Sequence, residues 1–244
     1  MIFARDKSQM CNNLLQFAHV YAWGREHGRH VISMRFSYKY QFFKIRHTRH
    51  ASFFWYLIAK YAAALRLLPT ASFKHSDCNH DDLEKKMMRH HNIVVSGWNV
   101  RFYDLFLKYR SEICDLFTID EIYTTRVDEW LKSEENGDSD NTLRLGVHIR
   151  RGDYAQWMNG RYCYDDKVFA SHIDKFRQMH PEVKTVHVYL ATNDPKVSAE
   201  GFRQLCSDGS IHFHLLGGNP VEDLYLLSQC DYLIGPPSTY SLVA

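Results

Sequence analysis

Short apolar runs alternate with longer polar and apolar repeats along this chain. The short runs have the length of strands, and in the first half they cover residues 2–4, 31–34 and 93–96. The longer repeats carry apolar residues at helical spacing, which predicts helices over residues 14–22, 51–68, 101–117 and 119–132. Asn12 and Asn13 precede the first of these and predict its N-terminal cap. A strand, a helix and a second strand in this order are typical of an α/β fold.

The alternation becomes more regular after residue 142. Four apolar runs predict strands at residues 143–149, 185–190, 211–215 and 232–234. Helical patterns follow them at residues 165–179, before Cys206, at 221–229 and from Ser238 onward. Strands that alternate with helices predict a parallel sheet joined by right-handed crossovers.

The clearest interruption of these patterns is the stretch from residue 134 to 141. It reads EENGDSDN, so it is acidic, contains one glycine and has no apolar residue. Such a stretch marks a linker between units. We therefore expect an N-terminal domain over residues 1–136 and a C-terminal domain over residues 142–244. The chain stops at Ala244, early in the last expected helix, which predicts that the second domain is clipped.

Composition narrows the class of protein. The 244 residues are 45% hydrophobic and carry a net charge of only +2, which gives no overall attraction to nucleic acid or to a membrane. The six cysteines are scattered without a C-x-x-C pair, as expected for free thiols in a reducing compartment. No export signal is apparent, and no apolar run approaches the roughly 18 residues of a membrane span. We expect a cytoplasmic protein, with attachment to the inner membrane face left open.

The strongest chemical signal lies at the end of the predicted strand 143–149, which runs into Arg150 and Arg151. Ligands of open α/β sheets bind beyond the carboxyl ends of the strands. The guanidinium group matches phosphate oxygens with two parallel hydrogen bonds, so an arginine pair here predicts a diphosphate ligand. The alternative is a surface arginine pair whose partner is Asp153.

Two other predicted strands end in polar residues that parallel topology would bring to the same edge. The strand 185–190 leads to Asn193 and Asp194, and the strand 232–234 leads to Ser238 and Thr239 at a helix N-terminus. Free N–H groups and hydroxyls at such an N-terminus suit phosphate, whereas a carboxylate suits the paired N–H donors of guanine. The alternative is that Asp194 and Ser238 are helix caps.

These segments read HIRRGDY at residues 148–154, VYLATNDP at 188–195 and EDLYLLSQCDYLIGPPSTYS at 222–241. In this order they resemble the GDP-fucose-dependent fucosyltransferases, most closely the bacterial α-1,2-fucosyltransferases, and the α-1,6-fucosyltransferases share the order. The segment MCNNLLQFA at residues 10–18 is similar to the glycine-rich opening of the family. Cys11 stands at a position where that opening has glycine. The Cys11 side chain would crowd a bound phosphate, because close approach of the backbone favours glycine.

The resemblance implies a GT-B fold of two Rossmann-like domains, with the donor GDP-fucose bound by the parallel sheet of the C-terminal domain. It implies an inverting, metal-independent transfer of L-fucose to a glycan hydroxyl, with no cofactor. Arg150 and Arg151 would stabilise the leaving diphosphate, and Asp153 is the candidate base or the partner of the arginines. The remaining donor-binding residues it implies are His148, Asn193, Asp194, Ser238, Thr239 and Asn12.

The acceptor implied by the resemblance is a glycan or a lipid-linked oligosaccharide, as in polysaccharide biosynthesis. An alternative is a non-catalytic relative that binds a GDP-sugar or a glycan. A third hypothesis starts from residues 35–49, where five basic side chains alternate with aromatic ones. Such a stretch is suited to contact an anionic acceptor or nucleic acid. More often it is a surface loop whose aromatic side chains pack in the core. We expect no nucleic-acid partner.

Overall fold

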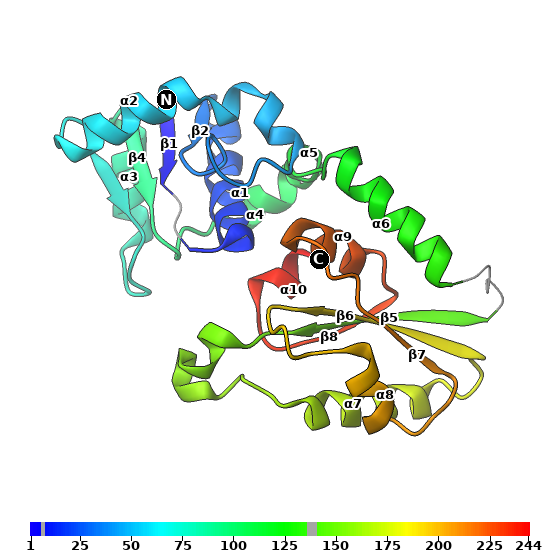
Figure 1. Cartoon of the computed structure of the whole chain (residues 1–244). Helices are drawn as coiled ribbons and strands as arrows, with labels where there is room; N and C mark the ends of the chain where they lie inside the picture. The colour runs from blue at the N-terminus through cyan, green and yellow to red at the C-terminus, as the bar shows by residue number, and fades with distance from the viewer. Residues whose placement is uncertain (6–7, 136–140) are drawn as a thin grey trace. The chain divides into compact units, whose positions relative to one another are not determined.

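The structure is a computed structural model that describes residues 1–5, 8–135 and 141–244. The chain divides into two compact units, Met1–Asp120 and Glu121–Ala244. Each unit contains a four-stranded sheet in which every pairing is parallel (Figure 1). The expected α/β class with parallel sheets is therefore confirmed.

The sheet of the N-terminal unit has the strand order β2-β1-β4-β3. Its strands are β1 (Ile2–Arg5), β2 (Val31–Ser33), β3 (Thr70–Ser72) and β4 (Ile93–Ser96). β3 was not predicted because its sequence, Thr-Ala-Ser, contains no apolar run. It exists as an edge strand through its pairing with β4.

The helices of this unit are α1 (Met10–Glu26), α2 (Phe53–Ala64), α3 (His80–Arg89), α4 (Tyr103–Lys108) and α5 (Arg110–Leu116). Two 3-10 turns, η1 (Lys44–His47) and η2 (Arg49–Ala51), precede α2. Among the described residues, no helix combines the length and the apolar character needed to cross a membrane.

The predicted cap of α1 at Asn12 and Asn13 is wrong. The helix begins earlier, after the extended residue Gln9, and Asn13 is fully buried within it. The side-chain amide of Asn13 donates to the carbonyl oxygens of Ser8 (3.1 Å) and Gln9 (2.9 Å). Asn13 thus lies inside the helix, where its side chain fixes the backbone of the two residues before the helix begins.

The sheet of the C-terminal unit has the order β7-β6-β5-β8, with β5 (Thr142–Ile149), β6 (Thr185–Thr192), β7 (Ile211–His214) and β8 (Tyr232–Ile234). The register places Ile149 beside Thr192 and Val147 beside Ile234. Because β5 lies between β6 and β8, all three strands end at the same edge. The convergence expected from the sequence is present.

Helices cover both faces of this sheet, as a parallel sheet requires (Figure 1). On one face, alternate β6 residues such as Val186 and Val188 join a core with α7 (Asp166–Met179) and α8 (Ala199–Leu205). On the other face, Tyr189 packs with residues of α6 (Glu121–Glu134) and α9 (Pro220–Ser228). Successive side chains of β6 therefore point to opposite faces of the sheet and belong to two separate cores.

The sequence pattern assigned α6 to the N-terminal domain, but its contacts group it with the C-terminal unit. Val127 and Leu131 pack against β6 and α9, and Arg126 forms an ion pair of 3.0 Å with the buried Glu222 of α9. The boundary expected at residue 136 lies among residues 136–140, which are outside the described residues.

Candidate functional site

The site expected from the sequence is formed by loops at one edge of the C-terminal sheet. After β5 come Arg150, Arg151 and two 3-10 turns, η3 (Gly152–Ala155) and η4 (Trp157–Gly160). Asn193 and Asp194 follow β6, and the segment after β8 leads through Ser238 into α10 (Thr239–Val243). The hydroxyl of Tyr154 donates to the carbonyl oxygen of Pro237 (3.0 Å), which joins the first of these loops to the third.

Asn193 holds the backbone of Arg151 from both sides. The N–H of Arg151 donates to Asn193 Oδ1 (2.8 Å), and Asn193 Nδ2 donates to the carbonyl oxygen of Arg151 (3.0 Å). Gly152 follows with a φ of 66°, where a side chain is strained, and a Cβ there would lie 3.3 Å from Asn193 Nδ2. Asn193 therefore positions the arginine loop with the amide that was expected to contact the donor.

The side chain of Arg151 is held by groups of the protein. Its Nη1 donates to Asp194 Oδ2 (3.0 Å), its Nη2 to Asp166 Oδ1 (2.5 Å) and its Nε to the carbonyl oxygen of Tyr164 (3.4 Å). Burial disfavours the charge of Arg151, but the hydrogen bonds to Asp194 and Asp166 outweigh burial and raise its pKa. Its guanidinium thus fixes the loop after β5 to that after β6 and to α7.

Asp194 is likewise occupied. Its Oδ2 accepts from Arg151, and its Oδ1 accepts from the backbone N–H of Lys196 (3.0 Å). The Lys196 and Arg151 bonds lower its pKa, so it is held as a carboxylate. The alternative of a helix cap is wrong for Asp194, because α8 begins five residues later at Ala199, after its own cap Ser198. Asp194 closes a turn instead.

Arg150 has a looser environment than Arg151. Its Nη2 lies 2.8 Å from Asp153 Oδ1 and 3.0 Å from Asp153 Oδ2, and its guanidinium stands 5.6 Å from the ring centre of Tyr154. The Asp153 side chain is 58% exposed. The alternative reading of Asp153 as the partner of an arginine is therefore present in the structure. An exposed ion pair of this kind is worth at most about 1 kcal/mol, so an incoming diphosphate can replace it.

His148 is buried at the end of β5, directly before the arginines. Its Nδ1 lies 2.8 Å from Ser241 Oγ, and its ring centre is 4.9 Å from that of Tyr240. Burial, reinforced by the charge of Arg150, lowers the pKa of His148 to about 4. The imidazole is neutral at neutral pH. Ser241 was not among the expected site residues, and its contact to His148 arises only through the pairing of β5 with β8.

Ser238 is the helix cap that the sequence offered as an alternative. Its Oγ accepts from the backbone N–H of Tyr240 (3.2 Å) at the start of α10, of which Thr239 is the first residue. Gly235 lies close to His148, because a Cβ there would come within 3.2 Å of both His148 Cβ and its carbonyl oxygen. The lack of a side chain at Gly235 lets this segment pass beside β5.

Asp223 is a candidate that the sequence reasoning missed. It lies in the first turn of α9, three residues after Pro220, whose carbonyl oxygen accepts from the Tyr240 hydroxyl (2.6 Å). Its Oδ1 is buried and has no hydrogen-bond partner among the described residues. Burial and the neighbouring Glu222 raise the pKa of Asp223 to about 7. In the sequence an acidic residue in a first helical turn is expected for helix stability alone, so it gave no separate signal.

The N-terminal unit contributes one expected residue, Asn12, which lies in the first turn of α1. Its Nδ2 donates to Ser8 Oγ (2.7 Å). The neighbouring Cys11 is only 2% exposed, and burial raises the pKa of its thiol to about 12. The Cys11 side chain is thus part of the core of this unit.

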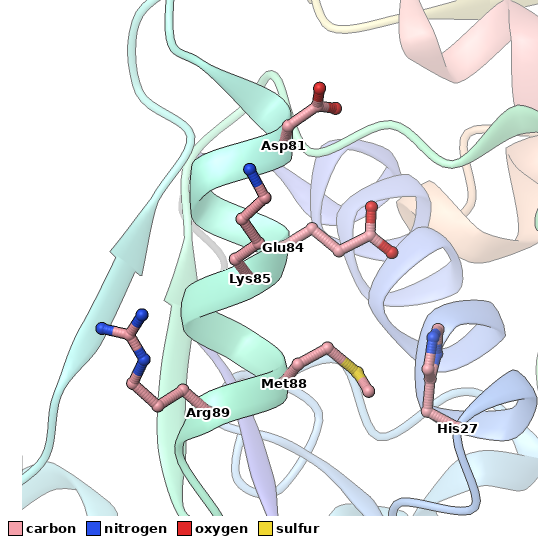
Figure 2. Close-up of a pocket in the computed structure, with 6 residues that line it drawn as sticks. All are labelled: His27, Asp81, Glu84, Lys85, Met88 and Arg89. Atoms are coloured by element: carbon pink, nitrogen blue, oxygen red, sulfur yellow. The ribbon is translucent and has the colours of Figure 1, made fainter.

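The N-terminal unit also has an open groove beside α3, of about 600 Å³, which no sequence motif indicated. Figure 2 shows its lining residues, His27, Asp81, Glu84, Lys85, Met88 and Arg89. The charges are of both signs, and Glu84 already accepts from Trp23 Nε1 (2.6 Å). Over the described part of the chain, no group of three His, Cys, Asp or Glu residues is placed to hold a metal ion.

Comparison with known sequences agrees with the motifs. The model of the family described as glycosyl transferase family 11 matches residues 72–244. The galactoside 2-alpha-L-fucosyltransferase Sec1 of Mus musculus is 25% identical in an alignment of 161 residues that covers 62% of this chain and 42% of that protein. The chain thus spans less than half of the length of this relative.

Solved structures share the fold. POFUT1 in complex with GDP-fucose has 10% identity and a TM-score of 0.59, over 99% of this chain and 91% of that chain. NodZ from Bradyrhizobium has 13% identity and a TM-score of 0.56, over 100% and 91%. FUT1 of Arabidopsis thaliana, in complex with GDP, has 12% identity and a TM-score of 0.63, over 99% and 66%. The similarity supports the expected class of two Rossmann-like units, as in GT-B transferases.

Proposed function

Because this chain belongs to glycosyl transferase family 11, we propose that it transfers L-fucose from GDP-fucose to a hydroxyl group of a glycan. The observation that carries the proposal is the edge of the C-terminal sheet, where neutral His148 and Arg150 at the end of β5 lie beside Ser238, which follows the adjacent strand β8. This edge lies within the segment that the family model matches. The proposed linkage, α-1,2, follows the name of the Mus musculus relative.

Arg150 is the proposed ligand of the donor diphosphate. Its only carboxylate partner among the described residues is the exposed Asp153, so the guanidinium can exchange that carboxylate for phosphate oxygens. The same charge would stabilise the GDP leaving group as the sugar–phosphate bond breaks, which is the role that a metal ion has in other transferases. We therefore propose a metal-independent reaction. Arg151 acts as a positioning residue that fixes the loop carrying Arg150.

Guanine is assigned to Asp223 in place of Asp194. A carboxylate must accept from two N–H groups of the base, and both oxygens of Asp194 are already used within the protein. Asp223 has a buried oxygen without a partner, one helical turn from the Pro220 contact to Tyr240. Two N–H donors from guanine would satisfy it.

The remaining contacts to GDP-fucose are proposed for side chains whose hydroxyl or amide groups can donate hydrogen bonds. Ser238 Oγ accepts from Tyr240, which leaves its own proton free to donate to a phosphate oxygen. Thr239 is the next hydroxyl at the start of α10, and Asn12 is the proposed contact from the N-terminal unit. In this proposal residues 142–244 bind the donor, and the N-terminal unit, Met1–Asp120, would choose the acceptor, a glycan or a lipid-linked oligosaccharide.

Inversion at the anomeric carbon requires a base that takes the proton of the acceptor hydroxyl. Asp153 is the proposed base. When the diphosphate binds Arg150, the carboxylate of Asp153 loses its partner, and its 58% exposure leaves it accessible to an acceptor. Donor binding would in this way prepare the base for the second substrate.

The proposal is tested by the release of GDP from GDP-fucose in the presence of a galactoside acceptor and of EDTA. We expect turnover that EDTA does not abolish, a β-to-α inversion in the product by NMR, and little turnover of GDP-mannose. Arg150→Ala should lower kcat by about 10²–10³-fold, as for loss of a donor that stabilises a leaving anion. The control is Arg203→Ala, whose side chain lies on α8 and pairs with Glu200. GDP binding without turnover on any acceptor would instead identify a non-catalytic relative.

A further inference from the structure

One long segment of the N-terminal unit contains no acidic residue. Residues 27–76 include nine lysines and arginines and neither aspartate nor glutamate. The whole chain has a net charge of only +2, so the rest of the chain is net negative. The positive charge is therefore concentrated in one segment, and α2 lies within it.

Helix α2 has large apolar side chains on the side that faces away from the core. Phe54, Ile58, Tyr61 and Leu65 are 65%, 40%, 61% and 70% exposed. Their spacing of four, three and four residues places them in one stripe along the helix and the residue that follows it. The opposite side carries Ala59, which packs in the core with Phe3, Ile32 and Val94. The exposed stripe is thus a second apolar face, additional to the one that the fold needs.

Cations border this stripe. Lys60 Nζ lies 5.9 Å from the ring centre of Tyr56 and 5.6 Å from that of Tyr61, and Arg66 is exposed just after the helix. In the described part of the chain, neither cation forms an ion pair with a carboxylate within 4.0 Å.

A second basic segment lies beside the helix. The rings of Tyr38 and Tyr56 stack at 4.7 Å, and Arg35 Nη1 donates to the hydroxyl of Tyr38 (2.9 Å). Residues 35–38 are therefore adjacent to α2 on the side of Tyr56, which packs against the core.

We propose that α2 is a docking surface for an anionic lipid bilayer. Phe54, Ile58, Tyr61 and Leu65 would enter the region between headgroups and acyl chains, and Lys60 and Arg66 would contact the lipid phosphates. A helix whose solvent-exposed face is apolar and bordered by cations binds membranes in this way, and anionic lipids strengthen the binding. A second copy of the chain fits less well, because two such surfaces would bring like charges together. The stripe also contains Ile and Leu, which do not stack on nucleic-acid bases.

The test is sedimentation of the whole chain with phosphatidylcholine vesicles that contain or lack phosphatidylglycerol. We expect binding to the anionic vesicles, weaker binding to the neutral ones, and loss of binding at high salt. The double variant Phe54→Ser with Leu65→Ser should weaken binding at least about tenfold, since it removes two large inserted side chains. Lys60→Glu with Arg66→Glu should weaken binding to anionic vesicles alone.

The matched controls are Leu107→Ser and Ile122→Ser, because these side chains are 67% and 75% exposed on other helices and should leave vesicle binding unchanged. The variants must keep the circular dichroism spectrum and melting temperature of the parent chain, which separates loss of docking from loss of folding. No binding to anionic vesicles would overturn the proposal. A second result would also overturn it: the parent chain self-associates or binds oligonucleotides, the Phe54→Ser, Leu65→Ser variant loses that binding, and the variant still binds vesicles as the parent does. None of these results depends on fucosyl transfer, so the two proposals fail separately.

Discussion

Arg150 and Arg151 are neighbours in the sequence but have different surroundings. The side chain of Arg151 contacts Asp194, Asp166 and a carbonyl oxygen, whereas that of Arg150 has a single exposed carboxylate partner. The sequence predicted both as ligands of a diphosphate. The division of their roles depends on Asp166, which the sequence places in an ordinary first helical turn 15 residues away. No local pattern indicates that contact.

We expect Arg151→Ala to destabilise the fold by about 1–3 kcal/mol, because it leaves two partly buried carboxylates without their cation. Arg150→Ala should change the free energy of unfolding by less than about 1 kcal/mol, since its partner remains exposed to water. Urea unfolding of both variants measures the difference. Equal losses of stability would contradict the separate roles of the two arginines.

The carboxyl of Asp223 should make GDP binding depend on pH. Its pKa of about 7 means that it is ionised above neutrality and protonated below, and only the ionised form accepts from two guanine N–H donors. GDP affinity should therefore fall as pH drops through 7. Asp223→Asn should weaken binding at pH 8 by about 10- to 100-fold and flatten this dependence. Calorimetric titrations from pH 6 to 8 measure both effects.

The same substitution should act on stability with the opposite sign. The folded pKa of Asp223 lies above its ordinary value of 3.8, so ionisation destabilises the native state as pH rises from about 4 to about 7. Asp223→Asn removes this penalty and should raise the melting temperature at pH 8. Glu200→Gln, on the exposed surface of α8, serves as the control. An Asp223→Asn variant that binds GDP as the parent does would remove Asp223 from the site.

At the scale of elements, the sequence predicted most of the strands because their apolar runs are continuous. β4 has the bounds that its apolar run indicated, and the three strands that end at the site are all present. The prediction failed where local pattern and tertiary contact differ. β3 has no apolar run and depends on β4, and the helix expected over residues 101–117 divides at Tyr109 into α4 and α5.

Asn193 joins the loop that follows β6 to the loop that follows β5. Asn193→Ala removes both hydrogen bonds to the backbone of Arg151, and we expect a loss of about 1–3 kcal/mol in stability together with weaker GDP binding. Asn193→Asp retains the acceptor for the Arg151 N–H but turns a carboxylate oxygen toward the Arg151 carbonyl oxygen, and should lose at least as much. Urea unfolding and GDP titration of this pair measure the effect. If both variants unfold as the parent does, the two hydrogen bonds do not stabilise the loop.

For the whole molecule, the sequence indicated two α/β units, a parallel sheet in the second and the edge of that sheet at which the ligand would bind. It did not show that α6 belongs to the second unit, because the interactions that hold α6 there come from β6 and α9, far along the chain. The sequence motifs did indicate the polar residues at the sheet edge. Asp223 and Ser241 were recognised only from contacts between elements.

Hydrogen–deuterium exchange tests the location of the nucleotide across the chain. With GDP bound, we expect slower exchange in residues 149–154, 193–194, 221–224 and 235–241, and in residues 8–12 if Asn12 contacts the donor as proposed. The strands β1 and β2 should exchange at the same rate with and without GDP. Protection confined to the groove of Figure 2, around His27 and α3, would place the nucleotide elsewhere.

The most direct measurement is a calorimetric titration of the intact chain with GDP, repeated for Arg150→Ala and for the control Arg203→Ala. We expect saturable binding by the parent chain and by the control, and a loss of at least about tenfold in affinity for Arg150→Ala, because one charge-assisted contact to phosphate is worth about 1.5–3 kcal/mol. Unchanged affinity in Arg150→Ala would contradict the assignment of the diphosphate to this edge of the sheet.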